Sequence, residues 1–404
     1  MNSKTVMIVA GEASGDAHGA GLVHAMQRMQ PALRFVGIGG ERLAAAGVDV
    51  RIDARSLSVV GITEVITKLP QLLRAAGRAK GLMTTERPAL LILIDFPDFN
   101  LHLAGHAKRL KIPVLYFISP QIWAWRPGRV RKIKRLVDHM AVILPFEERF
   151  YQAHGVPVTY VGHPLMDGES SDGTISGDIG DPEAPVISLL PGSRDREVEK
   201  HLPLLLDAAE RLQQNHRQAR FLVSCAPTID AGQVLQPVNA LTRQEPRLSM
   251  EVVCEDVRTL FARSTLSIAA SGTVTLQAAL CGTPTIIIYR ISPMSYRLGK
   301  MLIRVKHIGL ANLIAGRTIM PELIQADASP AKIAATADLL LKSPARLHKM
   351  RADLMAVKAL LGSGGASSRV ARIALGMLSK NRPAVQREIR GEKPTEKDAA
   401  EKRC

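Results

Sequence analysis

The chain has 404 residues, of which 46% are hydrophobic, and 53 Lys and Arg against 37 Asp and Glu give a formal net charge of +16. This composition excludes a chain that is disordered throughout and allows two α/β domains with separate cores. No apolar run approaches the roughly 18–20 residues of a membrane span, and no signal peptide is visible. Four scattered cysteines argue against a disulfide framework and a zinc site. We therefore expect a cytoplasmic protein whose basic surface favours nucleic acid, phosphorylated substrates or anionic lipid.

Apolar, β-branched runs recur along the chain with room for a helix between neighbours. Runs of this length are typical of strands buried on both faces of a parallel sheet. The predicted strands are 6–10, 35–38, 90–94, 114–118, 140–144 and 158–161, then 186–190, 221–224, 250–253, 266–270 and 285–289. Helical patterns alternate with them, as at 21–29, 101–110 and 202–213. The alternation predicts an α/β fold in which a doubly wound parallel sheet is built twice.

The composition changes at two places and sets the expected domain limits. Residues 166–185 are rich in acidic residues, glycine and serine, which predicts a linker between an N-terminal domain, 1–165, and a C-terminal domain, 186–362. Residues 382–404 are rich in charge, which predicts a disordered tail.

Two turns of small residues, Gly11–Asp16 and Ser271–Thr273, each follow a predicted strand and open a predicted helix. Such turns expose backbone N–H groups to a ligand or an anion. Ordinary helix capping explains each turn equally well when it is taken alone, with Asp16 as the cap of the first helix. The first turn lacks the GxGxxG spacing, so NAD is not inferred.

Two carboxylates follow the predicted strand 90–94. Asp95 comes directly after the strand, where a carboxylate can act as general base toward an alcohol. Asp98 is expected to cap a helix that begins near Leu101, and Asn100 is the other candidate cap.

The loop 119–126 holds both tryptophans of the chain, Trp123 and Trp125. Rare aromatic residues at a strand end indicate a pocket wall, and local packing of a loop is the alternative. Six basic residues then fall within Arg126–Arg135. They fit a solvated face or a contact with phosphate or membrane, without the aromatic interleaving of RNA-binding segments.

The second half of the chain carries features suited to a diphosphate. Arg194 follows the strand 186–190, where it can pair with a phosphate; a surface arginine beside Asp195 and Glu197 is the alternative. The hydroxyls and free N–H groups at Ser271–Thr273 suit phosphate oxygens, and Gln277 lies one turn further, toward ribose hydroxyls.

Two segments have amphipathic patterns. Residues 294–306 place basic and apolar side chains on separate helical faces, and residues 64–80 combine leucines with Lys68, Arg74 and Arg78. Each fits a helix on an anionic membrane, and core-facing helices give the same pattern. Pro70 argues against one straight helix in the second segment.

Taken together and in order, these motifs resemble the lipid-A-disaccharide synthase family. The resemblance runs from about Val6 to Gly376, and its motifs are 11–16, 94–100, 119–126, 144–147, 190–194, 270–273 and 312–317. It implies the GT-B fold: two facing Rossmann-like domains, with a last helix, 363–381, that crosses back to the first. The implied reaction is an inverting transfer from UDP-2,3-diacylglucosamine to 2,3-diacylglucosamine 1-phosphate, which yields lipid A disaccharide 1-phosphate and UDP.

The resemblance also implies roles for particular residues. Asp95 is the implied general base for the 6-hydroxyl of the acceptor. Arg194 and the helix terminus at Ser271–Thr273 offset the diphosphate charge, so that no metal is strictly needed and no cofactor is expected. Further substrate contacts are expected at Glu12, Ser14, Gly15, Asp98, Asn100, Trp123, Ser271, Gly272, Thr273, Gln277, Asn312, Glu322 and Gln325. Many relatives carry Glu where this chain has Gln277, so the expected contact with the ribose is a hydrogen bond from an uncharged side chain.

The family implies a peripheral enzyme on the cytoplasmic face of the inner membrane. Contacts with anionic lipid are expected at Leu69, Leu72, Leu73 and Arg74. Two other functions stay open: an enzyme such as a UDP-N-acetylglucosamine epimerase, and a basic nucleic-acid-binding protein. We expect no nucleic-acid partner, because a protein that only binds nucleic acid would not require the motifs found at the strand ends. The sequence leaves open whether the chain forms a homodimer.

Overall fold

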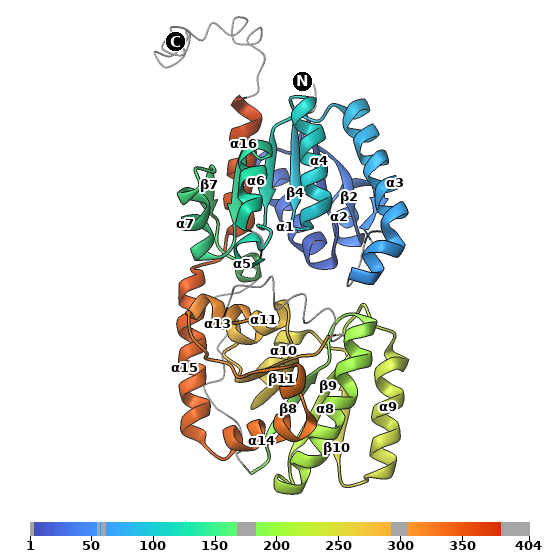
Figure 1. The fold of residues 1–404 in the computed structure, drawn as a ribbon, viewed down its shortest axis with the longest axis vertical. Helices are drawn as coiled ribbons and strands as arrows, with labels where there is room; N and C mark the ends of the chain where they lie inside the picture. The colour runs from blue at the N-terminus through green and yellow to red at the C-terminus, as the bar shows by residue number, and fades with distance from the viewer. Residues whose placement is uncertain are drawn as a thin grey trace, which may run out of the picture.

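The computed structural model describes residues 4–54, 57, 62–125, 127–167, 183–291 and 306–380. Figure 1 shows two lobes along the long axis of the molecule, each with a sheet flanked by helices. The predicted tail lies outside the described residues, as do most of the linker and residues 294–305 of the amphipathic segment 294–306.

The N-terminal lobe holds a sheet of parallel strands in the order β3-β2-β1-β4-β5-β6-β7. Its strands are β1 (Thr5–Ala10), β2 (Arg34–Gly39), β3 (Val48–Asp53), β4 (Leu90–Ile94), β5 (Val114–Phe117), β6 (His139–Val142) and β7 (Val158–Tyr160). Its helices are α1 (Ala13–Met29), α2 (Glu41–Ala45), α3 (Ile62–Glu86), α4 (Pro97–Arg109), α5 (Ile122–Trp125), α6 (Val130–Leu136) and α7 (Pro145–Ala153). The central strands β1 and β4 are completely buried from Val6 to Ala10 and from Leu90 to Ile94, as continuous apolar runs predict.

The C-terminal lobe repeats this plan with strands in the order β10-β9-β8-β11-β12-β13, again parallel. Its strands are β8 (Val186–Leu190), β9 (Arg220–Ser224), β10 (Ser249–Val253), β11 (Leu266–Ala270), β12 (Thr285–Tyr289) and β13 (Glu322–Ile324). Its helices are α8 (Asp195–Asn215), α9 (Ala231–Gln244), α10 (Val257–Ala262), α11 (Thr273–Leu280), α13 (Leu310–Ala315), α14 (Pro330–Leu341) and α15 (Pro344–Leu361). One continuous apolar cluster forms the core of this lobe.

The last helix, α16 (Ala366–Lys380), returns to the N-terminal lobe (Figure 1). It packs on α1, and Val370 and Ala374 belong to the core cluster on that side of the first sheet. The Asp167 carboxylate accepts hydrogen bonds from the N–H groups of Ala366 and Ser367, at 2.7 and 2.8 Å, and so caps this helix. The predicted fold, two doubly wound lobes with a crossing-back helix, is confirmed.

Every predicted strand is present, and two further strands lie at the edges of the sheets. The edge strand β3 alternates buried and exposed residues, so it lacks the continuous apolar run of a central strand. The other, β13, has three residues. Pro70 lies inside α3, which runs without a break from Ile62 to Glu86. None of the described helices is long and apolar enough to cross a membrane.

Candidate functional site

Both sheets reverse their strand order beside their first strand, β1 in one lobe and β8 in the other. In open α/β sheets, ligands bind beyond the carboxyl ends of the strands at such a point. Glu12 follows β1 and Asp95 follows its neighbour β4, while Arg194 follows β8 and Ser271 follows β11. The candidate residues therefore flank both switch points.

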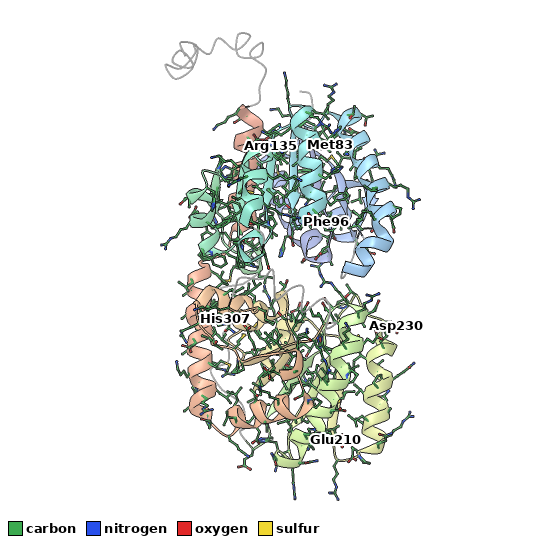
Figure 2. All side chains as sticks on the ribbon, in the orientation of Figure 1. Met83, Phe96, Arg135, Glu210, Asp230 and His307 are labelled. Atoms are coloured by element: carbon green, nitrogen blue, oxygen red, sulfur yellow. The ribbon has the colours of Figure 1, made fainter. Side chains whose placement is uncertain are left out.

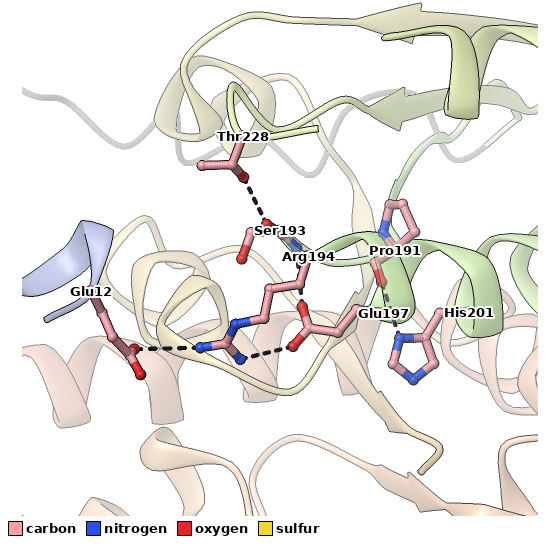
Figure 3. A network of polar contacts seen from close by, with 7 residues as sticks. All are labelled: Glu12, Pro191, Ser193, Arg194, Glu197, His201 and Thr228. Carbon is pink, nitrogen blue, oxygen red and sulfur yellow. Dashed lines mark hydrogen bonds and ion pairs between the residues drawn. The ribbon is translucent and has the colours of Figure 1, made fainter. Parts of the chain in front are cut away.

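A direct contact joins the two switch points. Arg194 Nη2 lies 3.4 Å from Glu12 Oε2 across the lobes, and Arg194 Nη1 lies 3.0 Å from Glu197 Oε1 (Figure 3). Figure 2 shows Phe96 and His307 on the sides of the two lobes that face each other, and Arg135 farther from the gap. The carboxyl edges of the two sheets thus face each other across the lobes.

Asp95 lies in an unusual backbone turn. Asp95 and Phe96 both have positive φ angles, 45° and 48°, which L-residues with side chains rarely adopt. The Asp95 carbonyl accepts hydrogen bonds from Tyr116 Oη and Asn100 Nδ2, each at 2.6 Å. Since Tyr116 and Asn100 are completely buried, they hold this turn from inside the domain. Tyr116 is a positioning residue that the sequence analysis missed, because a tyrosine inside an apolar strand looks like ordinary core.

The surroundings of the Asp95 carboxyl raise its pKa. Burial, and then the negative charge of Glu12, raise its pKa to about 7, while a hydrogen bond from the Phe96 backbone opposes the shift. A carboxylate with this pKa is a stronger base than an exposed one and still ionises near neutral pH.

Gly11 allows the Asp95 turn to pack against β1. A Cβ at Gly11 would lie 2.4 Å from Phe96 Cδ1, so the Phe96 ring occupies the space that any larger residue needs. The small residue at this position is therefore required by the neighbouring loop.

We expect Gly11→Ala to destabilise the protein by about 1–3 kcal/mol, because the Phe96 ring must move and disturb the Asp95 turn. Thermal unfolding measures the change. The matched control is Gly105→Ala in α4, where a Cβ meets nothing within 4 Å; it should be neutral or stabilising. Equal melting temperatures for Gly11→Ala and the parent protein would contradict this account.

Three polar side chains near this turn differ from their expected capping roles. The N-cap of α1 is Glu12, not Asp16, whose carboxylate instead accepts from the N–H groups of Gly40 and Arg42 at the start of α2. The N-cap of α4 is Phe96, not Asp98 or Asn100, because Pro97 begins the helix earlier than expected. Asp98 pairs with Arg129 at 2.6 Å.

Ser14 and Gly15 belong to the first turn of α1. Ser14 is exposed, whereas Gly15 is buried. A Cβ added at Gly15 would lie 3.5 Å from Ile94 Cγ2. The amide groups of this first turn face away from the helix body and are free to meet a polar ligand group.

The second lobe offers a helix terminus at the cleft. Gly272 is the N-cap of α11, and Gly272 and Thr273 are exposed, while Ser271 and Gln277 are half-buried. Thr275 turns its hydroxyl back to the Gly272 carbonyl at 2.8 Å, which stiffens the turn. The first N–H groups of α11 give this edge a positive potential.

His201 and Thr228 hold the loop that carries Arg194 (Figure 3). The buried His201 ring has Nδ1 3.0 Å from the Pro191 carbonyl and accepts the Arg290 N–H at Nε2, 3.0 Å. Burial lowers the pKa of His201, in agreement with a neutral ring that joins the ends of β8 and β12. The sequence carries no signal for His201, because a single histidine on an apolar helix face has no distinctive pattern.

Asn312 and Glu322 use their polar atoms within the protein. The completely buried Asn312 accepts from the N–H groups of Ile319 and Met320, and its Nδ2 donates to Glu322 Oε1 at 2.7 Å. The Glu322 carboxylate also accepts from Ile308 and Gly309, at the start of α13. These contacts make both side chains positioning groups for the neighbouring loops.

Gln325 differs from these two residues. It directly follows β13 with a φ of 57°, and its Nε2 is buried with no hydrogen-bond partner among the described residues. A buried donor without a partner is costly, so it is available to a ligand acceptor.

Trp123 belongs to a buried network at the end of β5. Its Nε1 donates to Glu147 Oε1 at 3.0 Å, and its ring meets Phe146 edge-on at 4.8 Å between centroids. Burial raises the pKa of Glu147 to about 7, although the Trp123 bond opposes the shift. Glu147 also accepts the Leu144 N–H at the start of α7, a capping contact that fixes this wall. The side chains of Trp125 and Arg126 lie outside the described residues.

The expected membrane residues lie on the described part of α3. Leu69 and Leu73 are 47% and 60% exposed, while Leu72 packs partly against the core. Arg74 Nε donates to the Pro70 carbonyl at 3.4 Å. Two leucines of this group thus face solvent.

Solved structures with this fold include an epimerase and a glycosyltransferase. A putative UDP-N-acetylglucosamine 2-epimerase from Listeria monocytogenes has a TM-score of 0.63 at 14% identity, covering 95% of this chain and 99% of that one. A calicheamicin glycosyltransferase has a TM-score of 0.60 at 14% identity, with 95% and 100% covered. At this identity they establish the GT-B fold alone.

Sequence relatives are much closer. Lipid-A-disaccharide synthase of Geobacter sulfurreducens is 46% identical over 382 residues, which cover 94% of this chain and 98% of that protein. The synthase of Syntrophus aciditrophicus is 46% identical over 385 residues, with 94% and 100% covered. The model of the family described as lipid-A-disaccharide synthetase matches residues 6–371. The chain therefore belongs to the lipid-A-disaccharide synthase family.

Proposed function

We propose that this glycosyltransferase joins UDP-2,3-diacylglucosamine to 2,3-diacylglucosamine 1-phosphate, giving lipid A disaccharide 1-phosphate and UDP. The observation that carries the proposal is the position of Asp95. Its carboxyl, with a pKa of about 7, lies beside Glu12, which itself reaches Arg194 on the opposite lobe. A proton acceptor and a phosphate-binding cation are thus held at one cleft.

In the proposed reaction, the 6-hydroxyl of the acceptor attacks the anomeric carbon of the donor in line with the departing UDP. Asp95 takes the hydroxyl proton as the new C–O bond forms. The bond from the anomeric carbon to the diphosphate breaks, and its electron pair stays on UDP. Inversion follows from attack on the face opposite the leaving group.

The C-terminal lobe stabilises the leaving group. Arg194 and the N-terminus of α11, with Ser271 and Thr273, offset the charge that develops on the diphosphate. Gln325 is proposed to donate its free Nε2 to the donor, and Gln277 to approach the ribose. Asn312 and Glu322 act indirectly, by fixing the loops around α13.

Turnover with defined substrates tests the proposal. The purified protein is incubated with acylated UDP-glucosamine and the acylated 1-phosphate acceptor, and disaccharide and UDP are measured together. Equal amounts of both products are expected. Epimerised donor without disaccharide would favour the epimerase alternative. Binding of nucleic acid without binding of UDP would favour the nucleic-acid-binding protein.

The pH dependence should follow Asp95. Because the base must be ionised, kcat/KM should rise with pH through about 7. Glu12→Gln removes a negative charge that raises the Asp95 pKa, so the midpoint of this rise should move to lower pH even if the maximal rate falls. Glu210→Gln, at the far end of the C-terminal lobe (Figure 2), should leave the midpoint unchanged. If the midpoint did not move in Glu12→Gln, the charge of Glu12 would not be what raises the pKa of the base.

Lipid contact through α3 is proposed from its exposed leucines and the basic charge of the chain. Replacing Leu69 and Leu73 with Ser should reduce binding to vesicles of anionic phospholipid by about tenfold, because two apolar side chains no longer enter the bilayer. Leu360→Ser, at a leucine 56% exposed on α15, is the control and should bind normally. Vesicle co-sedimentation measures both, and equal binding of all three proteins would place the lipid contact elsewhere.

A further inference from the structure

Cys225 and Cys254 end two neighbouring parallel strands, β9 and β10. The register pairs Ser224 with Val253, and the Cys225 N–H donates to the Val253 carbonyl at 2.9 Å. In a parallel ladder this bond sets Cys225 directly opposite Cys254. Neighbouring strands lie about 4.8 Å apart, within the roughly 4.4–6.8 Å that separates the Cα atoms of a disulfide.

The two side chains also interact. Both cysteines are free thiols; Cys225 is buried and Cys254 is exposed. Burial raises the pKa of Cys225, and the Cys254 thiol adds to the shift through its charge and a hydrogen bond, followed by Asp230. An exposed thiol that reagents can reach thus lies opposite a buried thiol on the neighbouring strand.

We propose that Cys225 and Cys254 form a reversible disulfide at the edge of the donor-binding lobe when a peroxide is present. The Cys254 sulfur attacks a peroxide oxygen, the O–O bond breaks, and a sulfenic acid and water or an alcohol result. Cys225 then loses its proton and attacks the Cys254 sulfur. The S–S bond forms, the S–O bond breaks, and water leaves. Two thiols are oxidised and one peroxide is reduced.

The disulfide is connected to the loop that carries Arg194. The chain continues from Cys225 to Thr228, whose Oγ1 donates to the Ser193 carbonyl at 2.7 Å (Figure 3). Gln233 Nε2 then donates to Asp195 Oδ1 at 3.2 Å. Both bonds join the segment after Cys225 to the residues on either side of Arg194.

Closing the disulfide therefore changes the donor site. The Cα atoms already lie at a suitable spacing, so the S–S bond forms by rotation of the two side chains. The new link restrains the segment 225–230, and through the bond from Thr228 to the Ser193 carbonyl it shifts the loop that carries Arg194. A displacement of about 1 Å in a positioning group lowers activity by up to roughly 100-fold. The oxidised protein is a weaker binder of UDP, and reduction restores it.

Peroxide titration of the full-length protein tests the proposal. Hydrogen peroxide is added, and intact mass and peptide mapping follow the thiols, while calorimetry measures UDP affinity. We expect a loss of two hydrogens, one cross-linked peptide joining Cys225 to Cys254, and an affinity for UDP about tenfold lower. Dithiothreitol should reverse both changes.

Single variants separate this disulfide from general oxidation. Cys225→Ser and Cys254→Ser should bind UDP as the reduced parent does and keep that affinity after peroxide treatment. Cys281→Ser, at the end of α11, should respond to peroxide as the parent does. Absence of the cross-linked peptide would overturn the proposed site, and a disulfide that leaves UDP affinity unchanged would overturn its connection to Arg194.

Discussion

Asp95→Asn should lower kcat by about 10²–10⁴-fold, the usual contribution of a general base, while UDP affinity stays within a factor of about two to three of the parent. The amide keeps the size of the carboxyl but cannot take a proton from the acceptor. The backbone of the turn should be preserved, because Tyr116 and Asn100 bind the Asp95 carbonyl and not its side chain. Steady-state turnover and UDP calorimetry measure the two quantities.

Asp207→Asn is the matched control for this substitution. Asp207 is exposed on α8, away from the cleft, so its neutralisation should leave kcat unchanged. If Asp95→Asn retained most of its turnover, another group would have to take the proton. If it lost UDP affinity and turnover together, the side chain would belong to the donor site instead.

Arg194→Ala should weaken UDP binding by about 10- to 100-fold, the range expected for losing a hydrogen bond between charged groups. The variant also leaves Glu12 and Glu197 without their cationic partner, so two carboxylates then repel the diphosphate. Arg194→Lys keeps the positive charge but loses the bidentate hydrogen bonding of the guanidinium, so we expect an intermediate affinity for UDP.

Lys200→Ala is the control for lost positive charge. Lys200 is exposed on α8, the helix that follows Arg194. Its replacement by Ala should change UDP affinity little. Equal losses in Lys200→Ala and Arg194→Ala would indicate that net charge, and not a local contact, binds the diphosphate. Unchanged affinity in Arg194→Ala would remove this residue from the site.

The fold was predictable because it depends on repeated local patterns. Central strands such as β4 and β11 are continuous apolar runs, and each is buried along its full length. Edge strands carry weaker signals: β3 alternates with charged residues, and β13 contains three residues. The apolar-run criterion found the central strands and the edge strands β7 and β10, and it missed the edge strands β3 and β13.

The position of several candidate residues at strand ends was predictable, but the contacts of each side chain were not. A carboxylate after a strand has the same sequence signal whether it caps its own helix or binds a neighbouring segment. Asp16 binds the start of α2, which is brought there by the pairing of β1 with β2. Asn100 likewise turns inward to the Asp95 carbonyl. Such contacts depend on tertiary packing, which local spacing does not encode.

The chain passes between the lobes twice, after Asp167 and before Ala366, and the two passages are fastened to each other. Asp167 accepts the N–H groups of Gly365 and Ala366, and Tyr160 Oη donates to the Leu361 carbonyl at 2.9 Å. The hydrogen bonds thus gather both connections between the lobes at one junction. We expect any change in the angle between the lobes to turn about this junction, because both connections would have to bend there.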